Sequence, residues 1–167
     1  METLCGRNGT PLYMHAAVHF LRGYDFDNNA DLERRMYILH DSVNELFREL
    51  IDRWMTEWYE EDLVKDVICL LCITRSGLMA NEIDDLLHYR EDKLGIQYGL
   101  SFGCFYDALS DFMSAGGGGF IRLFHKDIEE VVKEEFLDED WDDNAEYLMK
   151  LHAWCAEYFM HCINDQQ

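Results

Sequence analysis

The chain has 167 residues, of which 49% are hydrophobic and 14% aromatic, and its formal net charge is −20. This apolar content excludes a disordered chain, and the length suffices for one domain or two small ones with a buried core. No segment approaches the roughly 20 consecutive apolar residues that cross a bilayer, so we expect no membrane partner. The N-terminal residues also lack a basic-then-apolar signal pattern, and we therefore expect a cytoplasmic protein.

The charge balance argues against nucleic acid as a partner. The chain carries 34 Asp and Glu residues against 14 Lys and Arg residues, whereas binding to phosphates requires cations that displace counterions. The acids are densest between Asp127 and Asp143. A solvated helix face and an acidic loop explain this run most simply, and a docking surface for a basic partner is the alternative.

The N-terminal part of the chain predicts a lobe of helices. Thr10 can cap a helix that begins at Pro11, the only proline, and continues to about Leu21. A short helix follows through residues 32–38. The segment Ser42-Val43-Asn44-Glu45 has the form of a capping box. It opens a long helix whose apolar stripe has helical spacing and consists of Val43, Leu46, Phe47, Leu50, Ile51, Trp54 and Trp58.

The next part of the chain has the layout of a winged helix. Apolar residues at helical spacing predict three helices, through residues 63–71, 83–87 and 102–112. The alternating segment 120–124 predicts a strand, for which the segment near residues 96–98 is one candidate partner. We therefore predict a mainly α fold. A helical lobe over 1–60 precedes a winged-helix-like domain with a small β-hairpin over 61–137, and a C-terminal helical extension covers 138–167.

The six cysteines do not indicate a disulfide framework. Cys69 and Cys72 form a CxxC pair, but they lie within an apolar helix, and no second CxxC completes a metal site. A zinc cluster could be drawn from His152, Cys155, His161 and Cys162. Their mixed spacing on one helix favours structural roles instead, and we predict reduced thiols.

Six segments together resemble the C-terminal part of the signal-transducing STAND ATPases. Residues 8–13 look like the Gly-x-Pro motif of that family, and five later segments look like its winged helix and the strand–histidine–helix that ends it. These five segments are residues 63–68, 74–78, 83–87, 123–127 and 131–137. The match is nearest to the NACHT branch found in nephrocystin-type, telomerase-associated and NACHT–WD-repeat proteins. It covers nearly the whole chain.

This resemblance implies a nucleotide-dependent role for two residues. In the family, the proline packs against the adenine base, and the winged-helix histidine contacts the β-phosphate of ADP in the closed, inactive state. Carried over to this chain, the two cofactor-binding residues are Pro11 and His125. Where the family usually has Met-His-Asp, this chain has Phe124-His125-Lys126, and Met79 stands where this branch often has a serine cap.

The sequence contains no motif for catalysis by itself. No GxxxxGK[ST] is present, and the glycine run at 116–119 is not followed by Gly-Lys-Ser/Thr. Scattered Asp, Glu and His residues form no spacing that pairs a nucleophile with a base. We therefore expect no enzyme, no catalytic residue, no metal and no cofactor bound in isolation, with ADP or ATP bound only in a larger parent protein.

Two functional hypotheses follow. The first is a regulatory and interaction region that couples the nucleotide state of an upstream NTPase domain to autoinhibition and assembly. The second is a stand-alone acidic adaptor that binds protein partners and has no nucleotide role. A nucleic-acid-binding winged helix is disfavoured, because the segment that would form its recognition helix is acidic at Glu82, Asp84 and Asp85. Self-assembly within a parent protein is left open.

Overall fold

The computed structural model describes residues 10–22, 24, 29–95, 97–115, 118–138 and 142–164. Asn8 and Gly9 of the Gly-x-Pro segment, Ile96 of the candidate partner strand, and Gly116 and Gly117 of the glycine run lie outside the described residues. The chain divides into two compact units, Met1–Arg53 and Trp54–Gln167. The three-part division at residues 60 and 137 stays a prediction.

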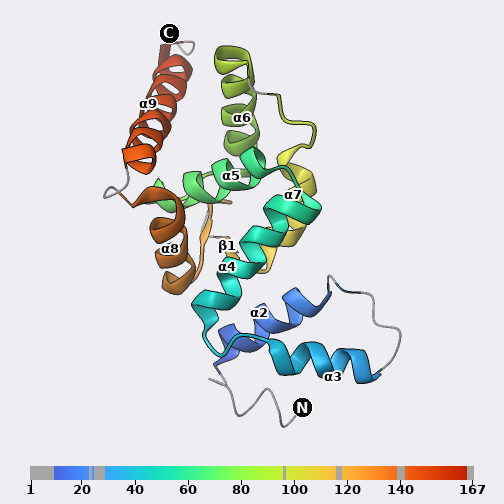
Figure 1. The fold of residues 1–167 in the computed structure, drawn as a ribbon. Helices are drawn as coiled ribbons and strands as arrows, with labels where there is room; N and C mark the ends of the chain where they lie inside the picture. Colours follow the sequence, from blue (N-terminus) through green and yellow to red (C-terminus); the bar gives the residue numbers. More distant parts are fainter. Residues whose placement is uncertain are drawn as a thin grey trace. The chain divides into compact units, whose positions relative to one another are not determined.

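The predicted fold class is confirmed, because the described chain is mainly helical with one small antiparallel hairpin (Figure 1). The first unit contains α2 (Pro11–Arg22), α3 (Asn29–Ile38) and α4 (Val43–Arg53). The second unit begins with the π-helical turn η1 (Trp54–Trp58) and continues with α5 (Glu61–Ile73), α6 (Ala80–Leu94), α7 (Phe102–Ser110), β1 (Met113–Ala115), β2 (Ile121–Leu123), α8 (Lys126–Val132), the π-helical turn η2 (Lys133–Leu137) and α9 (Asp142–Asn164).

The first unit is built on the packing of α2 against α4. Thr10 caps α2 as predicted, since its hydroxyl accepts a hydrogen bond from the Tyr13 backbone N–H at 3.2 Å. Arg53 is buried at the end of α4, where its guanidinium donates to the Phe20 carbonyl at 3.2 Å and lies 3.9 Å from the centre of the Tyr24 ring. The buried cation is thus stabilised by a hydrogen bond and by contact with an aromatic ring.

The long helix predicted through Trp58 changes character after Arg53. The backbone N–H of Tyr59 donates to the Trp54 carbonyl at 2.8 Å, which closes the wider π turn of η1. A π turn contains more residues than an α turn, so the side chains that follow are displaced around the helix axis. Trp54 is buried and packs against Phe105 and Phe112, with ring centres 5.3 and 5.9 Å apart.

The hairpin partner predicted near residues 96–98 is wrong. β2 pairs with β1, and Met113 stands opposite Leu123 in the register. The third helix ends at Ser110, short of the predicted Phe112, so the chain is free to extend and form β1. Leu78, between α5 and α6, also exchanges two backbone hydrogen bonds with Ile121, at 3.0 and 2.7 Å. The layout of three helices and a hairpin therefore includes a second, very short pairing, between β2 and the segment before α6.

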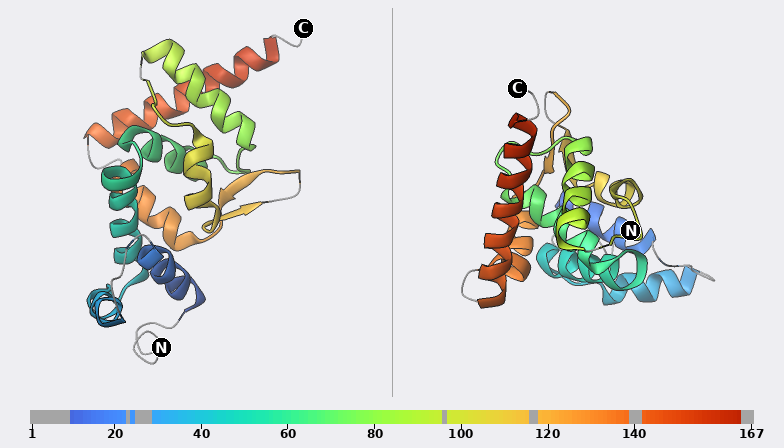
Figure 2. Two further views of the ribbon diagram at one scale, coloured as in Figure 1. Left: turned by 90° about the vertical axis from the view of Figure 1, so that its right-hand side faces the viewer. Right: turned by 90° about the horizontal axis from the view of Figure 1, so that it is seen from above.

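The core of the second unit lies where α5, α7, α8 and the hairpin meet, as Figure 2 shows. α5 supplies much of it, because nearly every residue from Leu63 to Leu71 is buried. β2 contributes Ile121 and Leu123, and α8 contributes Ile128, Val131 and Val132. Within the described part of the chain, no helix combines the length and the apolar composition that a membrane crossing needs.

Replacement of Gly77 by alanine should destabilise the second unit. Gly77 has φ +81°, and a Cβ atom there would lie 2.3 Å from the Ile121 carbonyl oxygen, which belongs to the Leu78 pairing. We expect a loss of at least about 1 kcal/mol in the free energy of unfolding, from backbone strain and the clash together. Urea denaturation measures it. Gly95→Ala is the control, because Gly95 has φ +69° and no atom within 4 Å of a new Cβ. Equal losses in the two variants would show that the contact with Ile121 has no effect.

Candidate functional site

The two residues predicted to contact nucleotide lie in different units. Pro11 is the first residue of α2 and is exposed. His125 is the residue immediately before α8, in the second unit. Each therefore begins a helix. Whether they line one cleft stays a prediction.

His125 has a local structural task at the start of α8. Its Nδ1 atom accepts a hydrogen bond from the Asp127 backbone N–H at 3.3 Å and lies 3.5 Å from the Asp127 carboxylate. The ring meets Phe124 edge-on, with centres 5.9 Å apart, and the side chain is 38% exposed. Because Nδ1 accepts, the neutral ring carries its proton on Nε2. That N–H has no partner among the described residues and can donate to a ligand.

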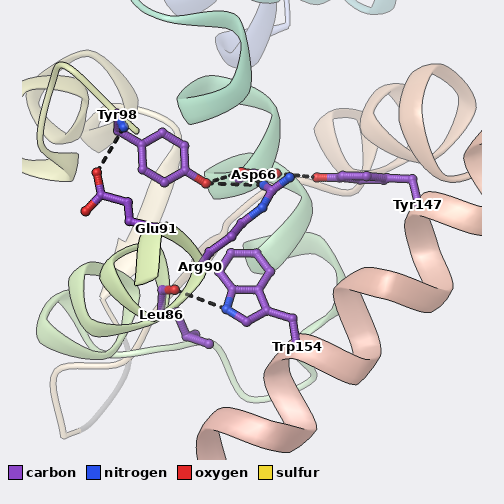
Figure 3. A network of polar contacts seen from close by, with 7 residues as sticks. All are labelled: Asp66, Leu86, Arg90, Glu91, Tyr98, Tyr147 and Trp154. Carbon is purple, nitrogen blue, oxygen red and sulfur yellow. Dashed lines mark hydrogen bonds and ion pairs between the residues drawn. The ribbon is translucent and has the colours of Figure 1, made fainter. Parts of the chain in front are cut away.

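The most elaborate polar arrangement of the second unit is centred on Asp66, and sequence analysis missed it (Figure 3). Asp66 lies in the middle of α5 with its side chain 1% exposed. It forms an ion pair with Arg90 of α6 and accepts hydrogen bonds from two phenols, Tyr98 and Tyr147. The Tyr147 bond measures 2.8 Å, and Arg90 also donates to the Tyr98 hydroxyl at 3.2 Å. One carboxylate thus joins α5, α6, α9 and the segment before α7.

Arg90 and its neighbours extend this network towards α9. The Arg90 guanidinium lies 5.3 Å from the centre of the Trp154 ring, and the Trp154 indole N–H donates to the Leu86 carbonyl at 3.0 Å. On the other side, the Lys65 ammonium lies 4.4 Å from the centre of the Tyr147 ring. Cations on aromatic faces and a satisfied indole N–H are favourable in a partly dry environment.

The phenols of this network remain protonated at neutral pH. Burial raises the pKa of Tyr98 to about 12, even though Arg90 acts in the opposite direction. Burial also raises the pKa of Tyr147, and the neighbouring Cys69 adds to the effect. Both hydroxyls are therefore permanent donors to the Asp66 carboxylate. These contacts hold segments of the second unit to one carboxylate, and we call the network the Asp66 clamp.

Two more carboxylates hold the segment between α6 and α7. Glu91 accepts a hydrogen bond from the Tyr98 backbone N–H at 2.9 Å, and both oxygens of Glu60 accept from the Gly99 N–H, at 2.9 and 2.8 Å. A side chain at Gly99 would collide with Glu60, because its Cβ atom would lie 2.4 Å from the carboxylate. Glycine thus allows the close approach of the Glu60 carboxylate, which would have to shift if a side chain were present.

A hollow of about 220 Å³ lies beside this clamped segment. Its lining combines Leu87 and Phe102 with Asp84, His88 and Glu91. The hydrogen bond between the His88 ring and the Asp84 carbonyl, followed by the charges of the nearby acids, raises the pKa of His88. The walls are therefore partly apolar and carry acidic groups, which suits a cationic side chain better than an anion.

The residues considered for zinc do not assemble a site. Among the residues that the structure covers, no group of three or more His, Cys, Asp or Glu side chains is arranged to hold a metal ion. Cys69, Cys72, Cys104, Cys155 and Cys162 are all free thiols. Asp66 itself carried one sequence signal, because an acid on the apolar face between Leu63 and Leu70 must find a partner when it is buried.

Comparison with known proteins adds no family assignment: no family model, no curated protein and no solved structure matches this chain.

Loss of the Asp66 charge should destabilise the second unit strongly. In Asp66→Asn, the Arg90 guanidinium, only 12% exposed, loses its counter-ion, and we expect a loss of about 3 kcal/mol in the free energy of unfolding. Tyr147→Phe removes one donor to a charged group and should cost about 1.5 kcal/mol. Denaturation in urea, followed by tryptophan fluorescence, measures both. The control is Asp62→Asn, an exposed acid on the same helix, which should cost less than about 1 kcal/mol. An equally mild Asp66→Asn would contradict the clamp.

Thiol labelling should separate the cysteines by burial. Burial raises the pKa of Cys69 to about 12 and that of Cys72 and Cys155 to about 11, so these thiols stay protonated and unreactive at pH 8. Cys104 is exposed and should react with iodoacetamide before these three thiols. Peptide mapping by mass spectrometry follows the order of modification. Labelling of Cys69 in the folded protein as fast as Cys104 would contradict its burial.

Proposed function

We propose that the chain is a non-catalytic regulatory and interaction region of a STAND-type nucleotide switch. It would couple the nucleotide state of an upstream ATPase domain to autoinhibition and assembly. The observation that carries this proposal is the order α5, α6, α7, hairpin and His125 within one compact unit. That order matches the winged helix ending in strand, histidine and helix that the resemblance implies.

The geometry of His125 supports the nucleotide part of the proposal. With Nδ1 engaged by the Asp127 N–H, the neutral ring keeps its Nε2–H as a donor on a side chain that is 38% exposed. A fixed N–H donor beside a diphosphate makes a hydrogen bond to a charged acceptor, which is stronger than a neutral one. ADP exchange or domain rotation can break a single bond of this kind, as a switch requires.

The acidic surface supports the interaction part of the proposal. α6 has an acid in its first turn, and the hollow beside it carries Asp84 and Glu91. These groups repel phosphates and attract basic protein segments. The same hollow is the observation that favours the second candidate function, a stand-alone acidic adaptor with no nucleotide role.

Two substitutions of His125 distinguish a ligand contact from a helix cap. Asparagine caps helices well and lacks an imidazole, whereas alanine provides neither feature. In a protein that joins an intact ATPase half to this chain, His125→Ala and His125→Asn should both release ADP faster, by about ten- to hundredfold, because a hydrogen bond to a charged group is lost. Release of a fluorescent ADP analogue measures the rate.

The outcomes separate the two candidate functions. If His125→Asn releases ADP at the rate of the unaltered protein while His125→Ala releases it faster, the imidazole acts only as a helix cap. His125 would then have no direct contact with the nucleotide. If neither variant alters ADP release, or if no Walker motif is encoded upstream of this chain, the switch is refuted. The stand-alone adaptor then takes its place.

A further inference from the structure

α9 has an exposed face of apolar residues with an unusually regular spacing. Met149, Met160 and Ile163 are 67%, 58% and 57% exposed, although each is a large hydrophobic side chain. Two exposed alanines, Ala153 and Ala156, lie between them. The five positions are separated by steps of four, three, four and three residues. We call this set the α9 seam.

The opposite face of α9 is already occupied. Leu151 and Trp154 are buried, Trp154 donates to the Leu86 carbonyl, and the Tyr158 hydroxyl donates to the Asp85 carboxylate at 3.3 Å. α9 contacts α6 within the second unit, and Figure 1 shows the two helices next to each other. Poor packing of α9 therefore does not explain the exposure of the seam. It is a second apolar face on a helix that is already fixed in place.

The spacing of the seam identifies the shape of its partner. Alternating steps of three and four residues average 3.5, the repeat with which one α-helix packs along another. The centre of the seam is small, at Ala153 and Ala156, and its ends are large. Two helices can approach closely at such a centre while the longer side chains interlock at either end. An isolated helix of two heptads would lose conformational entropy when it orders on binding. α9 is already ordered within the second unit, so this loss is small for the seam.

We propose that the α9 seam binds the same seam of a second copy of this chain, with the two helices antiparallel. This alignment sets Met149 opposite Met160 and Ala153 opposite Ala156 of the second copy, and it leaves Ile163 at the edge of the contact, opposite Glu146. The antiparallel direction follows from charge. Lys150 and Glu157 occupy the same heptad position beside the seam, one repeat apart. Antiparallel pairing brings each Lys150 to Glu157 of the second copy, whereas parallel pairing would set Lys150 beside Ala145.

The present partner of Lys150 does not prevent this exchange. Lys150 pairs with Glu146 at 2.6 Å, but both side chains are more than 60% exposed. Exposed pairs of this kind contribute little, so their rearrangement is easy. A net charge of −20 on each copy opposes association at long range. This repulsion is largely screened beyond about 8 Å at 0.15 M salt, whereas the Lys150–Glu157 contact is short.

Sedimentation equilibrium of the 167-residue chain tests the proposal, at protein concentrations from about 10 to 500 µM in 0.15 M salt, where a weak interface becomes populated. The unaltered chain should shift from monomer to dimer across this range. Ala156→Lys places a charge at the centre of the seam and should leave a monomer throughout. Ala80→Lys is the matched control, because Ala80 is an exposed alanine of α6 outside the seam, and it should dimerise normally.

Charge reversal tests the direction of the helices. Lys150→Glu and Glu157→Lys should each weaken the dimer by at least about tenfold, and the double variant should recover it, because the pair is restored with opposite polarity. If only the overall repulsion between the two acidic copies mattered, Glu157→Lys would reduce that repulsion and strengthen the dimer. A chain that is monomeric at every concentration, normal dimerisation of Ala156→Lys, or a stronger dimer in Glu157→Lys would overturn the proposal. Its test involves no nucleotide, so it stands or falls independently of the proposed switch.

Discussion

The second unit depends on one buried ion pair, that of Asp66 and Arg90. A carboxylate that is 1% exposed on the central helix α5 is costly to desolvate, and only close partners offset that cost. The structure supplies an arginine from α6 and two phenols, Tyr98 and Tyr147, whose raised pKa values keep them protonated. Each partner comes from a different segment, so the charge of Asp66 can be satisfied only when these segments are assembled together.

The consequences of this clamp reach the surfaces that we connect with function. Tyr147 and Trp154 hold α9 beside α5 and α6, and this orientation turns Met149 and Met160 to the outside. Tyr98 holds the segment before α7, with help from Glu91 and Glu60, and the acidic hollow lies beside it. An apolar pair at these positions could provide similar stability, but it would not require the same directional contacts.

The proposals concern three separate surfaces of one unit. The nucleotide role concerns the partly exposed side chain of His125, the adaptor role concerns the hollow at α6, and self-association concerns the outer face of α9. In a switch, self-association through α9 and the nucleotide contact of His125 would be coupled, because assembly must respond to the bound nucleotide. In an adaptor, the acidic hollow and a paired α9 would present two binding sites at once, which raises avidity without any new contact.

The sequence by itself determined the fold class, the helix beginning at Pro11 under the Thr10 cap, the buried stripe of α5 and the strand at 121–123, because these features depend on local periodicity and capping. It did not determine which segment pairs with that strand. Residues 113–115 were assigned to no element and residues 96–98 were the candidate partner, and only the tertiary packing of the hairpin decided otherwise. The same holds for Asp66, whose partners Arg90 and Tyr147 lie far away along the chain. Hydrophobic periodicity reports which face of a segment is buried, but the choice of partners across a core is made by desolvation and geometry among distant residues, which no local pattern contains.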